Sequence, residues 1–253
     1  MYHFFVEKDQ IDEVNKTLII CGNDYNHIVN VLRMKPGEEI SVSVIGGDSR
    51  EYRYGIEDIT GDEVICKLRF IKEDGVELPS KIYLFQGLPK GDKMELIIQK
   101  AVELGVYEII PVAMKRCIVK LDEKKAKSKL ARWQGIAEAA AKQSKRGIIP
   151  KVHMPLSYGE ALLMAEDKDA KLVPYELAKG MDETRKVLSS IKPGDSIAIF
   201  IGPEGGFDDT EIDKALSKGM KPITMGRRIL RTETAGFTIL AWLGYLMEDK
   251  DNN

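Results

Sequence analysis

The chain has 253 residues, of which 43% are hydrophobic and 31% are charged, and its formal net charge at pH 7 is −2. This mixture is typical of a folded protein with one large or two modest domains, and it excludes collagens, coiled-coil arrays and disordered chains. The longest apolar run, 237–247, is too short to cross a bilayer, and the first residues resemble no signal peptide, so we expect a cytoplasmic protein.

Neither a metal site nor a disulfide framework is expected. The three cysteines form no C-x-x-C pair, and the three histidines have no metal-ligand spacing. The serine-nucleophile motif G-x-S-x-G is also absent. His153 stands close to two prolines and is interpreted as structural, and Cys117 as an ordinary cysteine at the end of a strand.

Basic residues are concentrated in the segment 115–151, which holds twelve Lys and Arg residues against three acidic ones. Clustered cations of this kind bind the phosphates of nucleic acids. The alternative is a lysine-rich helix with a solvated face, and charge alone slightly favours that alternative.

Residues 1 to about 75 are predicted to form short strands with turns between them, which indicates a small barrel. The expected strands are 17–21, 39–44 and 63–70, with one short helix at 27–32. The polar, breaker-rich stretch 72–79 is the best linker, and it divides the chain into domains 1–74 and 75–253.

From residue 80 onward, predicted strands alternate with predicted helices, as in an α/β domain with a mostly parallel sheet. The expected strands are 82–86, 107–113, 172–175, 196–201 and 222–225, and the expected helices are 93–104, 123–143, 157–166, 182–190, 208–218 and 233–247. Asp92 and Glu95 are expected to form a capping box on the first helix. The last helix is apolar nearly all round, so it is either a central core helix or a contact with a second subunit.

A glycine-rich loop, IGPEGG at 201–206, follows a buried strand and precedes a helix that Asp208 and Glu211 are expected to cap, with Phe207 and Ile212 at the staple positions. Glycines at the carboxyl end of a strand allow a ligand to approach the backbone closely. The motif fits neither the dinucleotide nor the nucleotide-triphosphate loop. A simple tight turn carries about the same weight as a ligand site here.

A second candidate loop, 225–236, also lies between a strand and a helix. Its three arginines and Glu233 favour an anionic substrate over a merely exposed charged loop. We expect Ile229 and Leu230, in the middle of the loop, to be buried and to hold the arginines in place.

Together the two loops, IGPEGG at 201–206 and GRRILRTETA at 226–235, resemble the cofactor loops of the SPOUT superfamily. More narrowly, the chain resembles the bacterial 16S ribosomal RNA uracil-N3 methyltransferases over nearly its whole length. Further similar segments are HIVNVLR at 27–33, KMELIIQKAVELG at 93–105, Arg116-Cys117, Trp133-Gln134 and AAAKQSKR at 139–146. The departures are mild, with Met225 where leucine is usual and Gly236 where the family varies.

The resemblance implies an α/β fold with a PUA-like β-barrel RNA-binding domain followed by a SPOUT domain whose chain forms a trefoil knot. It also implies S-adenosyl-L-methionine as cofactor and 16S ribosomal RNA, or the small ribosomal subunit, as partner. The activity would be methylation of N3 of a specific uridine. We expect a homodimer joined through the C-terminal helix, and no membrane or metal.

The resemblance further assigns residues to these roles. The implied cofactor residues are Tyr175, Glu176, Ile201, Gly202, Pro203, Glu204, Gly205, Gly206, Met225, Gly226, Leu230, Thr232, Thr234 and Ala235. Arg231 is the first choice for stabilising the uracil anion, with Glu204 or Glu233 as proton acceptor, although capping of its own helix is almost as good an assignment for Glu233. The implied RNA contacts are His27, Arg33, Arg116, Lys142, Lys145 and Arg146.

Two alternatives remain open. Another member of the superfamily would methylate a ribose hydroxyl or a different base in transfer RNA. A non-enzymatic RNA-binding or assembly factor would keep the barrel and the basic segment without using the cofactor, and the complete glycine loops argue against it.

Overall fold

The computed structural model describes residues 1–72, 75–175 and 180–248, and the chain divides into two compact units. The first unit is Met1–Glu77 with Ala141–Ile149, and the second is Leu78–Ala140 with Pro150–Asn253. Within the first unit, Glu77 accepts hydrogen bonds from the Arg146 side chain and from the Gly147 backbone N–H of the segment 141–149. Within the described residues, no helix is long and apolar enough to cross a membrane.

The first unit is a six-stranded sheet in the order β1-β4-β5-β6-β3-β2, antiparallel except for the parallel pair β1–β4. The strands are β1 (His3–Val6), β2 (Ile11–Asp12), β3 (Thr17–Ile20), β4 (Glu39–Val44), β5 (Glu51–Ile59) and β6 (Val64–Lys72), with the helical segments η1 (Lys8–Gln10), α1 (Gly22–Asn26) and η2 (His27–Val31). The three predicted strands are confirmed as β3, β4 and β6, whereas the prediction missed β1, β2 and β5. β1 is formed by pairing with β4, about forty residues further along the chain (His3 opposite Ser41), and no local pattern announces such a partner.

The second unit contains a seven-stranded sheet in the order β10-β8-β7-β12-β11-β13, with β9 beside β8, and every strand pair is parallel. Its strands are β7 (Lys81–Gly87), β8 (Glu108–Ala113), β9 (Lys151–Val152), β10 (Leu156–Ser157), β11 (Ala170–Pro174), β12 (Ser196–Ile201) and β13 (Lys221–Ile223), and its helices are α2 (Lys93–Glu103), α3 (Glu123–Ser144), α4 (Tyr158–Met164), α5 (Gly180–Ser189), α6 (Asp209–Ser217) and α7 (Thr232–Met247). The predicted α/β class is confirmed. The order of the strands does not describe how the connections pass one another, and the trefoil knot stays a prediction.

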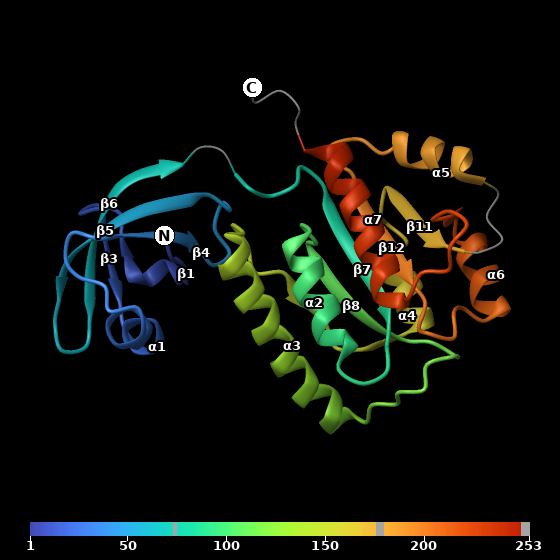
Figure 1. The fold of residues 1–253 in the computed structure, drawn as a ribbon, viewed down its shortest axis with the longest axis horizontal. Helices are drawn as coiled ribbons and strands as arrows, with labels where there is room; N and C mark the ends of the chain where they lie inside the picture. Colours follow the sequence, from blue (N-terminus) through green and yellow to red (C-terminus); the bar gives the residue numbers. More distant parts are fainter. Residues whose placement is uncertain (73–74, 176–179, 249–253) are drawn as a thin grey trace. The chain divides into compact units, whose positions relative to one another are not determined.

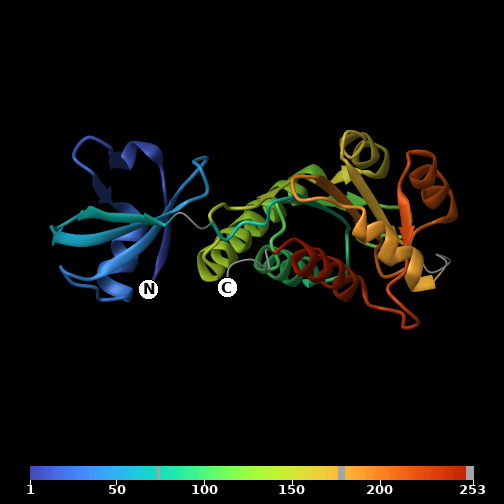
Figure 2. The ribbon, with the colours of Figure 1, turned by 90° about the horizontal axis from the view of Figure 1, so that it is seen from above.

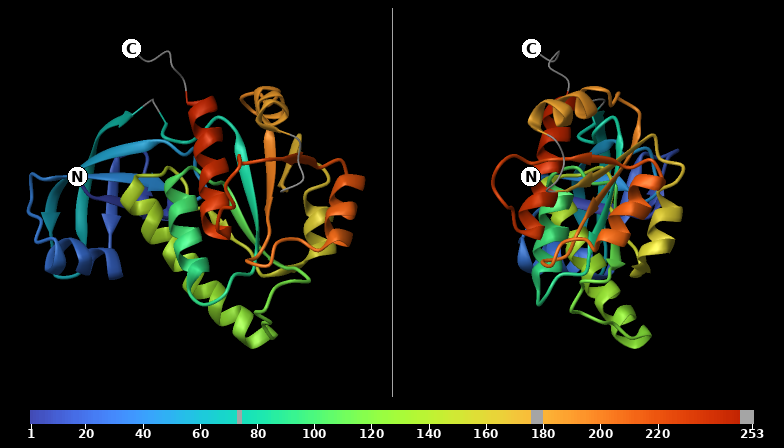
Figure 3. Two further views of the ribbon diagram at one scale, coloured as in Figure 1. Left: turned by 45° about the vertical axis from the view of Figure 1, so that its right-hand side comes forward. Right: turned by 90° about the vertical axis from the view of Figure 1, so that its right-hand side faces the viewer.

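Helices cover both faces of this parallel sheet. α2 and α7 lie side by side on one face, as Figure 1 and the left view of Figure 3 show. α4 and α6 lie on the opposite face, which is clearest from above in Figure 2. There Phe85 of β7 stacks on Phe200 of β12, with ring centroids 4.3 Å apart, and Tyr158 of α4 packs edge-on against Phe200. This core fixes the carboxyl ends of β7 and β12 side by side.

The two predicted capping boxes have different outcomes. The box of Asp208 and Glu211 forms at the start of α6, and Phe207 and Ile212 are both buried beside it. At the start of α2, by contrast, Asp92 makes no side-chain capping bond, so that prediction is wrong. Glu95 instead accepts a hydrogen bond from Arg132 of α3 at 2.7 Å, and this tertiary ion pair replaces the local cap.

The apolar helix α7 is expected to be either a central core helix or a contact with a second subunit, and it has features of both. One side is buried against the sheet and α2, with Ile239, Leu240 and Leu243 fully covered. The other side is open to solvent in this single chain, where Leu246 is 49% exposed.

Candidate functional site

A cavity of about 740 Å³ opens at the carboxyl ends of β11, β12 and β13. Parallel α/β sheets bind their ligands at this edge. The lining residues are Lys93, Arg116, Pro174, Tyr175, residues 201–207 at the glycine loop, residues 223–232 at the second loop, and Ala235. The two loops that the sequence analysis singled out therefore lie on the same cavity, although they are separated by α6 and β13 in the chain.

Twelve of the fourteen residues that the sequence analysis proposes for the cofactor line this cavity. Thr234 does not, because it lies on the exposed side of the first turn of α7. Glu176 lies outside the described residues.

The glycines of the two loops serve different purposes. Gly206 and Gly226 have φ values of 69° and 96°, a region that favours glycine, and no atom lies within 4 Å of where their Cβ atoms would stand. Gly205 is needed for packing, since a Cβ there would stand 3.1 Å from the Cβ of Arg116. A Cβ at Gly202 would likewise stand 3.2 Å from the Gly206 carbonyl carbon. The glycine loop is thus folded tightly on itself.

A buried hydrogen-bond chain ties the two loops together. The Nε2 of Gln86, at the end of β7, donates to Thr232 Oγ1 at 2.9 Å, and Thr232 Oγ1 donates to the carbonyl of Gly202 at 2.6 Å. Gln86 is fully buried, and Thr232, the first residue of α7, is 6% exposed. The first residue of α7 is therefore fixed against the glycine loop.

Lys93, which lines the cavity, places a cation between Glu204, which also lines it, and Glu233, which does not. Its Nζ lies 3.0 Å from Glu204 Oε1 and 3.5 Å from Glu233 Oε2. Burial acts to raise the pKa of Glu204, but hydrogen bonds from the backbone and from Lys93 outweigh it and lower the pKa. The ion pair with Glu204 also raises the pKa of Lys93. Glu204 is thus held as a carboxylate and Lys93 as a cation.

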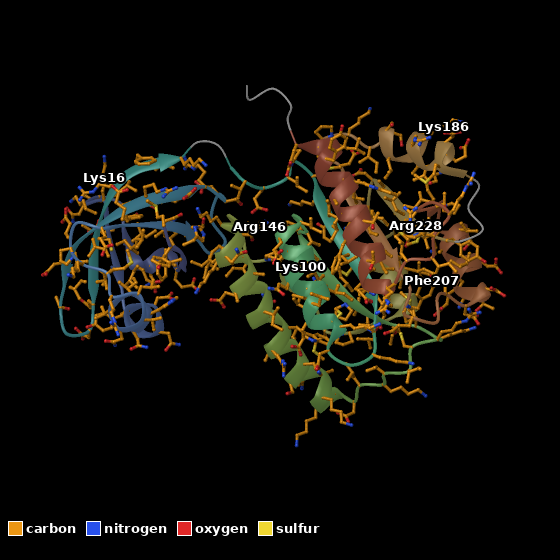
Figure 4. All side chains as sticks on the ribbon, in the orientation of Figure 1. Lys16, Lys100, Arg146, Lys186, Phe207 and Arg228 are labelled. Atoms are coloured by element: carbon orange, nitrogen blue, oxygen red, sulfur yellow. The ribbon has the colours of Figure 1, made fainter. Side chains whose placement is uncertain are left out.

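Four arginines line the cavity. Arg116 donates from Nη1 to the Gly205 carbonyl at 3.2 Å. The other three, Arg227, Arg228 and Arg231, have exposed side chains on the second loop, and Figure 4 labels Arg228 and Phe207 at this edge of the sheet.

The expectation of a buried apolar anchor in the second loop is wrong for Ile229. Ile229 is 94% exposed, and only Leu230 is partly covered. Thr224 Oγ1 instead accepts a hydrogen bond from the Gly226 N–H, so a bond between a side chain and the backbone shapes the start of this loop.

Of the proposed RNA-contacting residues, Arg116 lies at the cavity and the other five belong to the first unit. His27 and Arg33 are exposed at the two ends of η2, and Lys145 is exposed just after α3. Lys142 lies 3.4 Å from Asp24. Arg146 is 3% exposed and forms a bidentate ion pair with Glu77, so its guanidinium is not presented to solvent.

Gln86 and Lys93 are site residues that the sequence patterns did not reveal. Gln86 is a polar residue in an otherwise apolar strand. This pattern indicates a buried polar group, but it does not identify the residue to which the group is hydrogen-bonded. Lys93 is one of many helix lysines in this chain, and only the packing of α2 against α7 brings it to Glu204 and Glu233.

Comparisons with known proteins agree with this arrangement. A family model described as an RNA methyltransferase domain matches residues 76–244, and one described as an RNA methyltransferase PUA domain matches residues 20–69. The chain is 39% identical to ribosomal RNA small subunit methyltransferase E of Bacillus subtilis (strain 168), over 98% of each chain. It is 36% identical to the protein of the same name from Mesomycoplasma hyopneumoniae (strain 232), over 95% of this chain and 97% of that one.

A solved structure extends the likeness to the fold. The crystal structure of a ribosomal RNA small subunit methyltransferase E from Neisseria gonorrhoeae bound to S-adenosyl methionine superposes with a TM-score of 0.83 at 32% identity, over 97% of this chain and 98% of that chain. The expected PUA-like domain ahead of a methyltransferase domain is thereby confirmed. The chain belongs to the RNA methyltransferase family that includes the ribosomal RNA small subunit methyltransferases E.

Proposed function

We propose that this protein transfers a methyl group from S-adenosyl-L-methionine to N3 of a uridine in 16S ribosomal RNA. The observation that carries the proposal is the single cavity in which the glycine loop, the second loop and the cation of Arg231 meet. Relatives named small subunit ribosomal RNA methyltransferases support the choice of substrate. The N3 position rests on the resemblance of nearly the whole chain to the 16S ribosomal RNA uracil-N3 methyltransferases.

The residues of the cavity fit the cofactor. Its volume of about 740 Å³ lies within the range of roughly 300–1,000 Å³ that is usual for small-molecule sites. The backbone of the glycine loop and of Met225, Gly226 and Leu230 would hold the nucleoside and amino-acid parts. At Gly206 and Gly226 the space that a side chain would fill is open. S-adenosylmethionine supplies a methyl group made electrophilic by the positive sulfur to which it is bonded.

The protein must orient the uracil and help its N3 proton to leave. Arg231 is exposed at the cavity, and we assign it to stabilise the negative charge that develops on the base. Glu204 and Glu233 are the carboxylates proposed to accept the N3 proton, and both lie close to the cation of Lys93. The lowered pKa of Glu204 makes this carboxylate a weak base, so we assign the larger contribution to charge stabilisation by Arg231.

Because N3 lies on the pairing edge of uracil, the target base must be unpaired or turned out of its helix to enter the cavity. Arg116, at the cavity, would contact a phosphate of the same strand. Arg33, Lys142 and Lys145 of the first unit are proposed as further phosphate contacts, whereas the buried ion pair of Arg146 with Glu77 suits a structural role.

Three further parts of the proposal follow from the family resemblance. The second unit is proposed to contain the trefoil knot. The protein is proposed to act as a homodimer, and the exposed apolar residues Leu246 of α7 and Leu96 of α2 are the surface offered for the contact. Because its proposed substrate is ribosomal RNA, we expect it to act in the cytoplasm.

Calorimetric titration with S-adenosylmethionine tests the cofactor assignment. The wild type is expected to bind, and Gly205→Val is expected to lose binding because the new side chain collides with Arg116. Gly61→Val is the control, since no atom lies within 4 Å of a Cβ at that position. A folded wild type that does not bind would refute the enzyme assignment.

Nucleoside mass spectrometry then identifies the product. We expect 3-methyluridine in 16S ribosomal RNA. A methylated ribose, or a methylated base in transfer RNA only, would favour the alternative members of the superfamily.

A further inference from the structure

A run of basic residues leads away from the cavity along the second unit. Residues 115–129, here called the basic segment, contain seven Lys and Arg residues and only two acidic ones, Asp122 and Glu123. The segment leaves the sheet after β8, passes the cavity at Arg116, and enters the first turns of α3 (Figure 1). It is therefore continuous with the proposed active site.

Much of this charge is not neutralised within the chain. Lys115 pairs with Asp208 at 2.9 Å, and Lys125 and Lys127 pair with Asp122 and Glu123. In the part of the chain that the structure describes, the side chains of Lys120, Lys124 and Lys129 form no hydrogen bond or ion pair. A helix whose charges serve only solubility interleaves both signs, whereas this segment keeps an excess of one sign next to a cavity.

The second loop adds further cations to the cavity lining. Arg227 and Arg228 line the cavity and are exposed on the second loop, while the acidic Glu204 of the cavity lining and Glu233 of α7 are paired with Lys93. A polymer with one negative charge per monomer that inserts one monomer into the cavity must carry the charges of the neighbouring monomers past these cations. An RNA strand has this charge pattern, because each nucleotide carries one phosphate. Its target base can be turned out of the strand to reach the cavity beside the cofactor.

We infer that the basic segment binds the phosphates of the RNA strand next to the target nucleotide, with Lys120, Lys124 and Lys129 as the contacts beyond Arg116. This inference rests on the proposed function and extends it, because it assigns phosphate contacts beyond Arg116 to the methyltransferase unit. Contacts of this kind carry affinity without sequence preference, and they depend on salt.

The test is the triple variant Lys120→Gln, Lys124→Gln, Lys129→Gln, assayed with a 16S ribosomal RNA transcript and with a 20-nucleotide oligouridylate. We expect the KM for the transcript and the Kd for the oligouridylate to rise at least about tenfold at moderate salt. The slope of log Kd against log salt should fall by about 2, since each single-strand phosphate contact contributes about 0.7. Turnover at saturating transcript and the Kd for S-adenosylmethionine should stay the same.

The matched control removes three lysines from the same unit, through Lys186→Gln, Lys192→Gln and Lys221→Gln. Lys192 and Lys221 precede or begin β12 and β13 at the edge opposite the cavity, and Lys186 on α5 lies well away from Phe207 in Figure 4. If the two triple variants bind the oligouridylate equally well and with the same salt slope, the inference is overturned, and an acidic protein partner becomes the better occupant. A wild type that neither binds S-adenosylmethionine nor methylates the transcript would instead refute the proposed function. The oligouridylate measurement would still test whether the basic segment binds RNA.

Discussion

The side chain of Gln86 donates a 2.9 Å hydrogen bond to the hydroxyl of Thr232, two residues that are 146 positions apart in the chain. The same hydroxyl donates to the carbonyl of Gly202, so one buried threonine connects the end of β7, the glycine loop and the start of α7. Both proposed cofactor loops depend on this contact for their relative position.

Replacing Thr232 with the isosteric Val should loosen this connection. The carbonyl of Gly202 then loses its donor and Gln86 Nε2 loses an acceptor, which costs roughly 1–3 kcal/mol in a buried site. We expect the free energy of unfolding to fall by about 2 kcal/mol and S-adenosylmethionine to bind at least about tenfold more weakly, since 1.4 kcal/mol corresponds to tenfold. Thr232→Ser keeps the hydroxyl and should restore both values, and equal affinities for the two variants would contradict the role of this bond.

Removing the cation of Lys93 should change the pH dependence of catalysis. Hydrogen bonds from the backbone and from Lys93 lower the pKa of Glu204 against the opposing effect of burial. In Lys93→Met that pKa should rise, so Glu204 takes up a proton at higher pH and the acid limb of kcat/KM moves upward. Lys90→Met is the matched control, because Lys90 contacts Glu204 through its backbone N–H and not through its side chain. The profile is to be measured from pH 4.5 to 9, and an acid limb that does not move in Lys93→Met would exclude this electrostatic role.

Arg231→Ala should reduce turnover without abolishing RNA binding. A positioned donor that stabilises a developing anion contributes about 10²–10³ in kcat, so we expect a loss of about a hundredfold at saturating transcript. Arg185→Ala on α5 removes another exposed arginine, one outside the cavity lining, and should leave kcat unchanged. Unimpaired turnover by Arg231→Ala, with transcript bound, would remove Arg231 from the mechanism.

A buried histidine should make the first unit sensitive to acid. His3 is 6% exposed, its Nδ1 lies 2.8 Å from Ser41 Oγ, and burial lowers its pKa from 6.5 to about 4 despite the nearby Glu51. Between these two pH values the unfolded chain binds the proton and the folded chain does not. Stability is therefore complete above pH 6.5 and declines as the pH falls toward 4, by up to about 3 kcal/mol from this residue.

Urea unfolding of the wild type and of His3→Gln, at several pH values from 4 to 7, isolates this contribution because all other groups cancel in the difference. The variant should lose less stability than the wild type over this range. Parallel curves for the two proteins would show that His3 is not responsible.

Local sequence determined much of this protein. The box of Asp208 and Glu211 forms as predicted because a capping box needs only residues three apart, and β12 spans 196–201 as predicted because its side chains are apolar on both faces. The glycine-rich spacing also identified the two loops that line the cavity.

Tertiary structure decided what local patterns leave open. Asp92 and Glu95 carry the spacing of a capping box, yet Arg132 takes the Glu95 carboxylate, because an ion pair with another helix competes with a cap. Arg146 belongs by sequence to a basic cluster, but Glu77 buries its guanidinium in a bidentate pair. The apolar Ile229 is exposed, since burial depends on which elements surround a loop and not on the side chain alone.

The site itself shows the same division. The sequence determined which segments carry its chemistry, because glycines, arginines and carboxylates have intrinsic properties that do not depend on the fold. Only the parallel order of β7, β12, β11 and β13 brings the ends of these strands to one edge and places Lys93 between Glu204 and Glu233. Contacts between residues more than a hundred positions apart arise from packing of the whole sheet, and no local stretch of sequence contains them.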